Sequence, residues 1–304
     1  MLYLSTYSIV AFDKELEEFG IAVQSRAFRA GAIVPHAKAN VGAIASQAMA
    51  NLSYGPKGLE LLQEGLSAHE TVQRLTAEDE QREHRQVAVI DSQGHIAQHT
   101  GTECLEWAGH KSGKNWAAQG NILVGREVLD AMGEAFEKSE GILAEKLMAA
   151  LEAAQAAGGD RRGQQAGGIL VVRPNAYFDG VYDRLVDVRV DDHPEPIKEL
   201  RRLLGIALPS VHLLTTRLFL ERQSPDRAHA LLDRALAKDP QQPLLRLAWI
   251  GYLARTHKRS EALQEIERLL AKAGTDRESF KRYLKTNALF QPLHNDTEFQ
   301  RLMQ

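Results

Sequence analysis

Cysteine and long apolar runs are both scarce in this chain of 304 residues. The single cysteine, Cys104, excludes an internal disulfide and any cysteine-cluster metal site. No apolar run approaches the roughly 20 residues that span a bilayer, so we expect no membrane association. The N-terminus has no basic segment and no apolar stretch of useful length, which argues against a secretory signal. We therefore expect a cytoplasmic protein in a reducing compartment.

A strong net charge is also missing. The chain has 37 Lys and Arg against 40 Asp and Glu, a formal charge of −3, which gives no reason to expect a nucleic-acid partner. Hydrophobic residues make up 44% and charged residues 25%, which is typical of a globular protein and not of a disordered or fibrous one. The histidines and acidic residues follow no metal-ligand spacing, so we expect no metal and no other cofactor.

Glycine and charge are unevenly distributed. Only Gly251 and Gly274 of the 23 glycines follow residue 206. Residues 207–304 hold 16 basic and 11 acidic side chains, a net charge of +5, which leaves −8 for residues 1–206. Glycine-rich sequence favours strands and turns, whereas glycine-poor sequence favours helices. Because Pro209 interrupts a helical pattern, we predict two domains, 1–206 and 207–304.

The second domain repeats itself. Segment 224–238 aligns with segment 258–272, and Ala228, Arg234 and Lys238 meet identical residue types at Ala262, Arg268 and Lys272. The constant offset matches the period of about 34 residues that is typical of tetratricopeptide repeats, which are helix–turn–helix units. The resemblance covers about two units, with 278–304 as a cap, and implies a small all-α domain. Such a domain binds a protein partner or packs on its neighbour, and a plain helical bundle is the alternative.

The sequence of the first domain predicts β-hairpins and pairs of helices. Two packed antiparallel sheets covered by layers of helices would bury the apolar faces of these elements, which is an αββα sandwich. A single-sheet α+β fold is the alternative. Ser67 and Glu70 form a capping-box pattern at the start of one helix. We predict strands at 6–12, 20–25, 32–40, 41–47, 85–91, 95–100, 169–172 and 185–190, and helices at 53–62, 126–138, 142–157 and 195–204.

A series of short motifs carries a more specific resemblance. The motifs lie at 6–11, 20–25, 45–48 with Asn51, 54–59, 85–86, 100–101, 107–109, 119–121, 158–163 and 190–194. Together they are similar to the domain-of-unknown-function family 1028, which is assigned to the N-terminal-nucleophile (Ntn) hydrolase superfamily. The resemblance covers about residues 6–205 and implies a four-layer αββα fold and amide-bond hydrolysis.

The resemblance implies that Thr6 is the nucleophile. In such enzymes a Thr, Ser or Cys at a free N-terminus attacks the substrate while its own α-amine acts as the base. Residues 1–5 precede Thr6 and must be removed first, and Leu2 is too bulky for ordinary methionine removal to help. The alternative is that Thr6 is a strand residue of an unprocessed, inactive relative.

Further site residues are predicted around Thr6, each with a structural alternative. Lys38 lies on a strand where some relatives place a lysine that lowers the amine pKa, but it equally suits a solvent-facing position. Asn121 and Gln119 flank a glycine and would donate hydrogen bonds to an oxyanion or brace a loop. The candidate substrate-binding residues are Arg26, as a carboxylate ligand or a surface ion-pair partner, Ser46, Gln47 and Asn51, as a polar pocket or a helix cap, and Asp160, as a cleft or turn residue.

Two functions of different classes follow. The first is an Ntn-type amidohydrolase or peptidase that acts on an unknown amide substrate. The second is a non-catalytic interaction protein, in which an inactive hydrolase-like domain carries a helical repeat that recruits a protein partner through residues 207–304. Exposed hairpin edges and helix faces of such sandwiches commonly pair, so we also expect a homo-oligomer.

Overall fold

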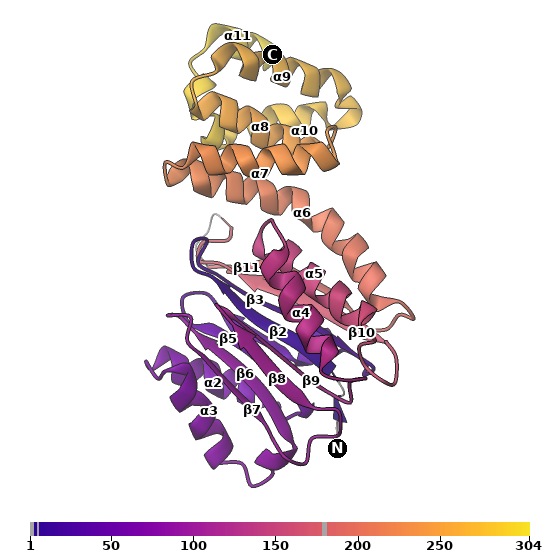
Figure 1. Cartoon of the computed structure of the whole chain (residues 1–304). Helices are drawn as coiled ribbons and strands as arrows, with labels where there is room; N and C mark the ends of the chain where they lie inside the picture. The colour runs from indigo at the N-terminus through magenta and orange to yellow at the C-terminus, as the bar shows by residue number, and fades with distance from the viewer. Residues whose placement is uncertain (1–2, 5, 178–180) are drawn as a thin grey trace. The chain divides into compact units, whose positions relative to one another are not determined.

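The computed structural model describes residues 3–4, 6–177 and 181–304, and its contacts divide the chain into two compact units (Figure 1). Unit 1 is Met1–Leu204 and unit 2 is Gly205–Gln304. Unit 1 is an α+β structure with two antiparallel sheets, and unit 2 is helical, as the sequence predicts.

The first sheet has the order β1-β5-β6-β7, and β4 also pairs with β5. All of its pairings are antiparallel. Its central strands β5 and β6 are buried along their whole length, which explains why their sequences are largely apolar. The strands are β1 (Tyr3–Leu4), β4 (Pro35–Lys38), β5 (Gly42–Met49), β6 (Arg85–Asp91) and β7 (Ile96–Thr100).

The second sheet has six strands in the order β11-β10-β3-β2-β9-β8, again all antiparallel. Strands β2, β3, β9 and β10 form its buried centre, and β8 and β11 are its edges. The strands are β2 (Thr6–Asp13), β3 (Glu18–Ser25), β8 (Gly109–Gly113), β9 (Trp116–Asn121), β10 (Ala166–Val172) and β11 (Arg184–Val190).

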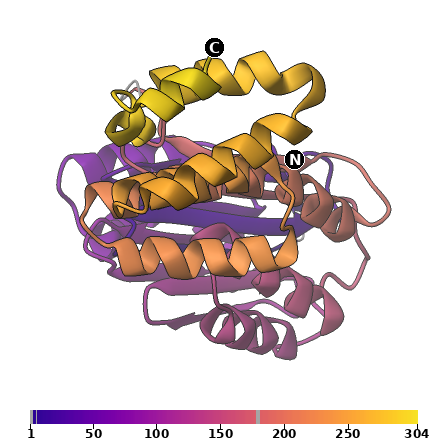
Figure 2. The same cartoon turned by 90° about the horizontal axis from the view of Figure 1, so that it is seen from above.

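The two sheets face each other across an apolar core that includes Val10, Ile21 and Ile90. Helices α2 (Tyr54–Gln63) and α3 (Ala68–Ala77) pack on the outer face of the first sheet. Helices α4 (Glu127–Lys138) and α5 (Leu143–Ala156) pack on the outer face of the second sheet (Figure 1; seen from another side in Figure 2). The short α1 (Ala30–Ile33) and the 3-10 turn η1 (Arg82–His84) complete unit 1.

Several local predictions are confirmed. The hairpin of β2 and β3 and the hairpin of β6 and β7 form as expected. The capping box is present with both of its hydrogen bonds: the Glu70 backbone N–H donates to Ser67 Oγ, and the Ser67 backbone N–H donates to Glu70 Oε2. The strand predicted at 32–40 is wrong in part, because α1 occupies its first residues and only β4 is extended.

Unit 2 contains helices whose ends recur at the period found in the sequence. The sequence separation between Ala228 and Ala262 is the repeat interval. Helix α6 ends at Glu221 and α8 ends one repeat interval later, at Arg255. Helix α9 likewise begins and ends one repeat interval after α7 begins and ends. The buried Ala228 and Ala262 lie at equivalent positions in α7 and α9. The helices are α6 (Pro196–Glu221), α7 (Pro225–Lys238), α8 (Pro243–Arg255), α9 (Arg259–Lys272), α10 (Arg277–Thr286) and α11 (Thr297–Leu302), with the 3-10 turns η2 (Gly274–Asp276) and η3 (Ala288–Leu293).

The prediction that a helix ends at residue 204 is wrong, because α6 continues through Pro209 to Glu221. Pro243 shows why the sequence suggested a boundary. It lies one repeat interval after Pro209 and occupies the first turn of α8, where a missing N–H has no consequence. Pro243 thus begins a helix, whereas its equivalent Pro209 lies inside the continuous helix α6.

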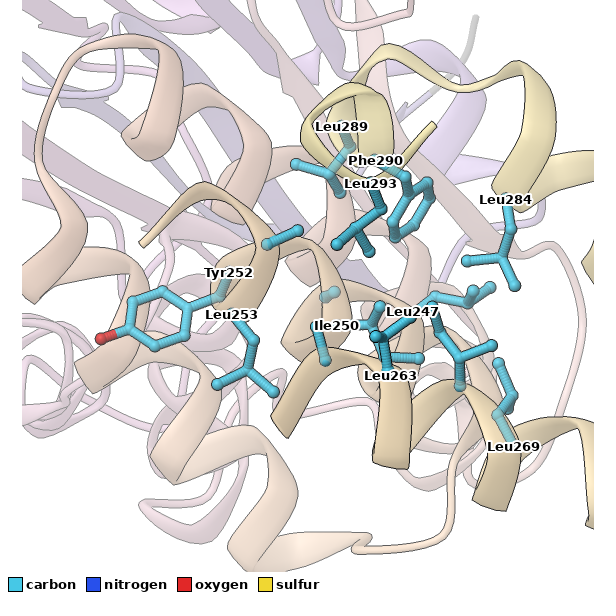
Figure 3. Close-up of a cluster of buried hydrophobic side chains, with 14 of the residues drawn as sticks. Leu247, Ile250, Tyr252, Leu253, Leu263, Leu269, Leu284, Leu289, Phe290 and Leu293 are labelled. Atoms are coloured by element: carbon cyan, nitrogen blue, oxygen red, sulfur yellow. The ribbon is translucent and has the colours of Figure 1, made fainter. Parts of the chain in front are cut away.

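The apolar core of unit 2 explains why these helices stack. Leu247, Ile250, Leu263 and Phe290 are almost fully buried and come from α8, α9 and η3 (Figure 3). The helices can bury these apolar surfaces only against their neighbours, because no single helix forms a core.

Helix α6 is also the one helix in the described part of the chain that is long and apolar enough to cross a membrane. Its most apolar window has a mean hydropathy of 1.6, and 39% of that window is buried. This is weak evidence for a membrane span, because the core helix of a globular protein passes the same test.

Candidate functional site

The candidate site lies at one end of the layer between the two sheets, where β2 begins. Thr6 is the first residue of β2, and its cross-strand neighbours are Ser25 on β3 and Asn121 on β9. All three side chains belong to fully buried residues. Thr6 Oγ1 donates a hydrogen bond to Ser25 Oγ at 3.1 Å. The predicted nucleophile is therefore an interior threonine with a second hydroxyl beside it.

Alternation along β2 assigns its residues to two faces. Ser8 points into the layer between the sheets, where its Oγ donates to Gln47 Oε1 on the opposite sheet at 2.6 Å. Tyr7 points the other way, and its hydroxyl donates to Gln155 Oε1 of α5 at 3.0 Å. Thr6 shares the face of Ser8, because successive side chains in a strand alternate.

A buried amide network joins the two sheets at this end. Gln47 Nε2 donates to Gln86 Oε1 at 2.8 Å and to the Thr6 carbonyl oxygen at 3.3 Å. Asn121 Nδ2 donates to the same Gln86 oxygen at 3.1 Å. Gln119 Nε2 donates to the Ala45 carbonyl oxygen at 2.9 Å. The sheets are thus held together by polar contacts here and by apolar packing further along.

The chain changes sheets immediately before Thr6. Tyr3 and Leu4 form β1, which pairs with Met49 and Ala48 of β5 in the first sheet, whereas Thr6 begins β2 in the second sheet. In the full chain the Thr6 nitrogen belongs to the peptide bond with residue 5, so it cannot act as a base.

A loop connects the ends of β3 and β9, the two strands that flank β2. The Asp160 carboxylate accepts hydrogen bonds from the backbone N–H groups of Arg26 and Arg162, at 3.1 and 2.9 Å, and lies 3.4 Å from the Arg162 guanidinium. The Arg161 backbone N–H donates to the Ile122 carbonyl oxygen. Asp160 therefore braces this loop against both strands. The exposed Arg26 guanidinium contacts the Gln164 carbonyl oxygen at 3.4 Å and makes no ion pair among the described residues.

Lys38 is not brought near Thr6. It pairs with Gly42 at the opposite end of β5 from Gln47, roughly 17 Å along the strand at 3.3 Å per residue. Its side chain is exposed, and its Nζ donates to Gln63 Oε1 at 2.6 Å. The role of Lys38 beside the nucleophile therefore has no geometric support. A strand signal alone could not distinguish the two ends of the sheet.

Ser46 and Asn51 also lie apart from Thr6. Ser46 follows the alternation of β5 and faces the α2 and α3 side, where its Oγ donates to the Asn51 carbonyl oxygen at 3.4 Å. Asn51 Oδ1 accepts from the backbone N–H and the hydroxyl of Ser53, at 3.1 and 2.8 Å, just before α2. These two residues stabilise the start of a helix, and Gln47 alone of the predicted trio enters the buried network.

A charged cluster lies beside that helix start. Asp79 accepts hydrogen bonds from Arg85 Nε and Asn51 Nδ2, both at 2.9 Å. Burial opposes ionisation of Asp79, but these hydrogen bonds outweigh it and hold the pKa of Asp79 well below its usual range. Arg85 Nη1 also donates to the Met49 carbonyl oxygen at 2.6 Å, at the end of β5. The cluster fixes the strand end against which β1 lies.

Sequence reasoning missed Ser25 and Gln86 as members of the site, and it placed Ser8 on the strand face of Thr6 without giving it a role. Each is a polar residue near one end of a strand with an apolar centre, and buried polar groups need hydrogen-bond partners. Sequence reasoning also treated Gln119 and Asn121 as loop residues, whereas both lie on β9. Among the described residues, no group of three or more His, Cys, Asp or Glu side chains could hold a metal ion.

The fold and the site together define an α+β protein whose paired sheets enclose an apolar core with a polar, hydroxyl- and amide-rich end. Residues 6–200 match the family described as Family of unknown function (DUF1028). The chain is similar in structure to protein SPO2555 from Silicibacter pomeroyi, which carries the same family designation. The two are 33% identical with a TM-score of 0.61, over 67% of this chain and 89% of that one. No curated protein matches the sequence. The chain belongs to the DUF1028 family.

Proposed function

We propose that unit 1 is an amide-bond hydrolase of the N-terminal-nucleophile type, in which Thr6 becomes the nucleophile once residues 1–5 are removed. In this proposal the two sheets and their covering helices are the four-layer αββα sandwich of that superfamily. The observation that carries the proposal is the position of Thr6, which opens a central strand, faces the space between the sheets and lies between Ser25 and Asn121.

The chemistry requires the α-amine of Thr6 to be free. An unperturbed α-amine has a pKa of about 7.7–8.0, so it can accept the Thr6 hydroxyl proton near neutral pH. The hydroxyl oxygen then attacks the amide carbonyl carbon, and the resulting oxyanion needs hydrogen-bond donors. Asn121, which pairs with Thr6 across β2 and β9, supplies Nδ2 as the candidate donor in this proposal. Collapse of the intermediate expels the amine, which takes the proton, and water then hydrolyses the acyl ester.

The position of β1 supports processing as the activating step. Removal of residues 1–5 takes away β1 and its pairing with Ala48 and Met49. The new N-terminus is then Thr6 at the end of the polar layer. The second hydroxyl, Ser25 Oγ, lies 3.1 Å from Thr6 Oγ1, and in this proposal it relays a proton between the amine and the nucleophile.

The proposal is tested by comparing two forms of the protein. One is the full chain, and the other begins at Thr6 after cleavage of a fusion partner. Both are treated with a β-lactone, an electrophile that acylates N-terminal threonine, and the adduct is located by peptide mass spectrometry. We expect an adduct on Thr6 only in the shortened form, its retention in Thr6→Ser and its loss in Thr6→Ala.

The native N-terminus provides the second measurement. The protein purified without a tag from its own cells should have the mass of residues 6–304. A full-length native mass, together with a folded but unreactive Thr6-initiated form, would refute the proposal. That result would support the alternative, a non-catalytic platform. The observation favouring that alternative is that Ser8, Gln47 and Gln86 already bind one another in the full chain.

For unit 2 we propose a tetratricopeptide-like fold that binds a protein partner. The recurrence of helix ends at one constant interval supports this assignment. We also propose that the protein is a cytoplasmic homo-oligomer. Size-exclusion chromatography with light scattering at micromolar concentration tests the oligomer, and a monomer mass of 33.8 kDa would contradict it.

A further inference from the structure

A cavity of about 400 Å³ lies within unit 2, and it shares no residue with the site described above. Its walls come from the start of α8, the C-terminal half of α9 and one residue of α10. A volume in this range is typical of small-ligand sites. Three of its lining residues are cationic, namely Arg246, Arg268 and Lys272, and only Glu265 is anionic.

One carboxylate cannot neutralise these three cations. Glu265 Oε2 lies 3.3 Å from Arg246 Nη1, and Glu265 Oε1 lies 2.7 Å from Arg268 Nη1, so a single side chain holds both guanidinium groups. Lys272 Nζ donates to the neutral Gln241 Oε1 at 2.7 Å. The lining of the cavity therefore keeps a net positive charge, with two guanidinium groups held in place by one carboxylate.

The wall also has apolar parts. Leu269 belongs to the buried core of unit 2 (Figure 3) and also lines the cavity. Phe280 of α10 is half-buried and lines it from the other side. A hydrated inorganic ion gains nothing from contact with these apolar side chains, whereas an anion that carries an apolar group would contact both Leu269 and Phe280.

The charges of the cavity are not a general property of the repeat. The residues one repeat interval before Arg246 and Glu265 are His212 and Leu231, and both are buried. Arg234 and Lys238, in contrast, are the equivalents of Arg268 and Lys272 in α7. The first repeat therefore has the outer cations without the central carboxylate.

We propose that this cavity binds an organic carboxylate, meaning a carboxyl group attached to an apolar or aromatic group. The planar guanidinium groups of Arg246 and Arg268 match a carboxylate by paired N–H···O bonds, Lys272 adds a point charge, and Phe280 contacts the apolar part. The carboxylate comes either from a small free acid or from the C-terminal end of a peptide. The site is independent of the hydrolase proposal, because it lies wholly within unit 2.

Calorimetric titration of the full chain tests the site with two matched pairs of probes. The first pair is 3-phenylpropanoate and its uncharged amide, 3-phenylpropanamide. The second pair is the peptide acetyl-Leu-Phe with a free carboxylate and the same peptide amidated. We expect binding of the carboxylates and at least about tenfold weaker binding of the amides, because charge-assisted hydrogen bonds are lost. The stronger binder of the two carboxylates identifies a small acid or a peptide end as the preferred source.

The repeat supplies the control variants. Arg268→Gln with Lys272→Gln should weaken carboxylate binding by about tenfold or more, whereas Arg234→Gln with Lys238→Gln should leave it unchanged. All four side chains are on helix surfaces, so circular dichroism should show both variants folded. Equal binding of amides and carboxylates, equal loss in both variants, no binding of either carboxylate, or displacement by inorganic phosphate at the same concentration would each overturn the proposal.

Discussion

Gln86 should be the most stabilising polar residue of unit 1, because it joins its own strand β6 to four other strands and links both sheets. Its Nε2 carries two N–H groups and shares them among three acceptors, namely Thr100 Oγ1 at 3.0 Å and the carbonyl oxygens of Gly109 and Gly120 at 3.1 and 2.9 Å. Its Oε1 accepts from Gln47 and Asn121. The substitution Gln86→Met keeps the side-chain volume and removes all of these hydrogen bonds.

The expected loss follows from what remains buried. A typical hydrogen bond contributes about 1 kcal/mol net, and a buried group left without a partner costs about 1–3 kcal/mol. Gln47 Nε2 keeps the Thr6 and Gln119 carbonyl oxygens as acceptors, so its loss is small. The two glycine carbonyls bear most of the cost. We expect Gln86→Met to lower the free energy of unfolding by about 3–5 kcal/mol.

Gln98 offers a matched control on the neighbouring strand β7. It is partly exposed, and its Nε2 donates to the Ala118 carbonyl oxygen at 2.9 Å. Gln98→Met should therefore cost about 1 kcal/mol. Both variants are measured by urea unfolding in a Trp249→Phe background, so that the remaining tryptophans, Trp107 and Trp116, report on unit 1. If Gln86→Met costs no more than Gln98→Met, the network does not stabilise the contact between the sheets.

Two further predictions concern charge and packing. Burial raises the pKa of Glu18 to about 7, against the opposing pull of Arg173 at 3.2 Å, so the folded state retains a proton that the unfolded chain releases near pH 4.5. Because of this group, the free energy of unfolding should fall by about 3 kcal/mol between about pH 4.5 and pH 7. Urea titrations of Glu18→Gln should lack this pH-dependent fall. A difference in unfolding free energy between the two proteins that does not change with pH would contradict the prediction. A Cβ at Gly251 would lie 2.3 Å from Leu289, so Gly251→Ala should lower the free energy of unfolding by about 1–3 kcal/mol. A Cβ at Gly205 meets nothing within 4 Å, so Gly205→Ala should raise the free energy of unfolding by about 0.5–1 kcal/mol. Thermal unfolding measures both changes. Equal shifts in the two glycine variants would show that contact with Leu289 is not the cause.

The elements that the sequence predicted well are those with strong local signals. Strand β6 has an apolar, β-branched centre, and α3 has a complete capping box. The hairpin of β8 and β9 escaped prediction because β8 is the polar segment Gly109–Gly113 at a sheet edge. An edge strand needs little β-propensity of its own, since its partner supplies the hydrogen bonds.

The candidate site could be predicted only as far as strand position allowed. Thr6, Gln47, Gln119 and Asn121 are buried together because each lies on an inward face near the same end of a sheet. Ser46 is one residue from Gln47 and faces the opposite way, because strand side chains alternate. The end of the sheet at which a residue lies depends on pairing between distant strands, and this is why the sequence left two positions open for Lys38.

The constant interval between helix ends in unit 2 has a genetic consequence. Since α7 and α9 begin and end at equivalent positions of the repeat, an in-frame duplication of one interval would join a helix end to an equivalent turn without altering either. The chain could thus lengthen by whole repeats, and each new helix would pack against the apolar surface of the helix before it. Growth of this kind would stop at α10, where Lys281 and Leu284 are its only buried residues and the opposite surface is polar.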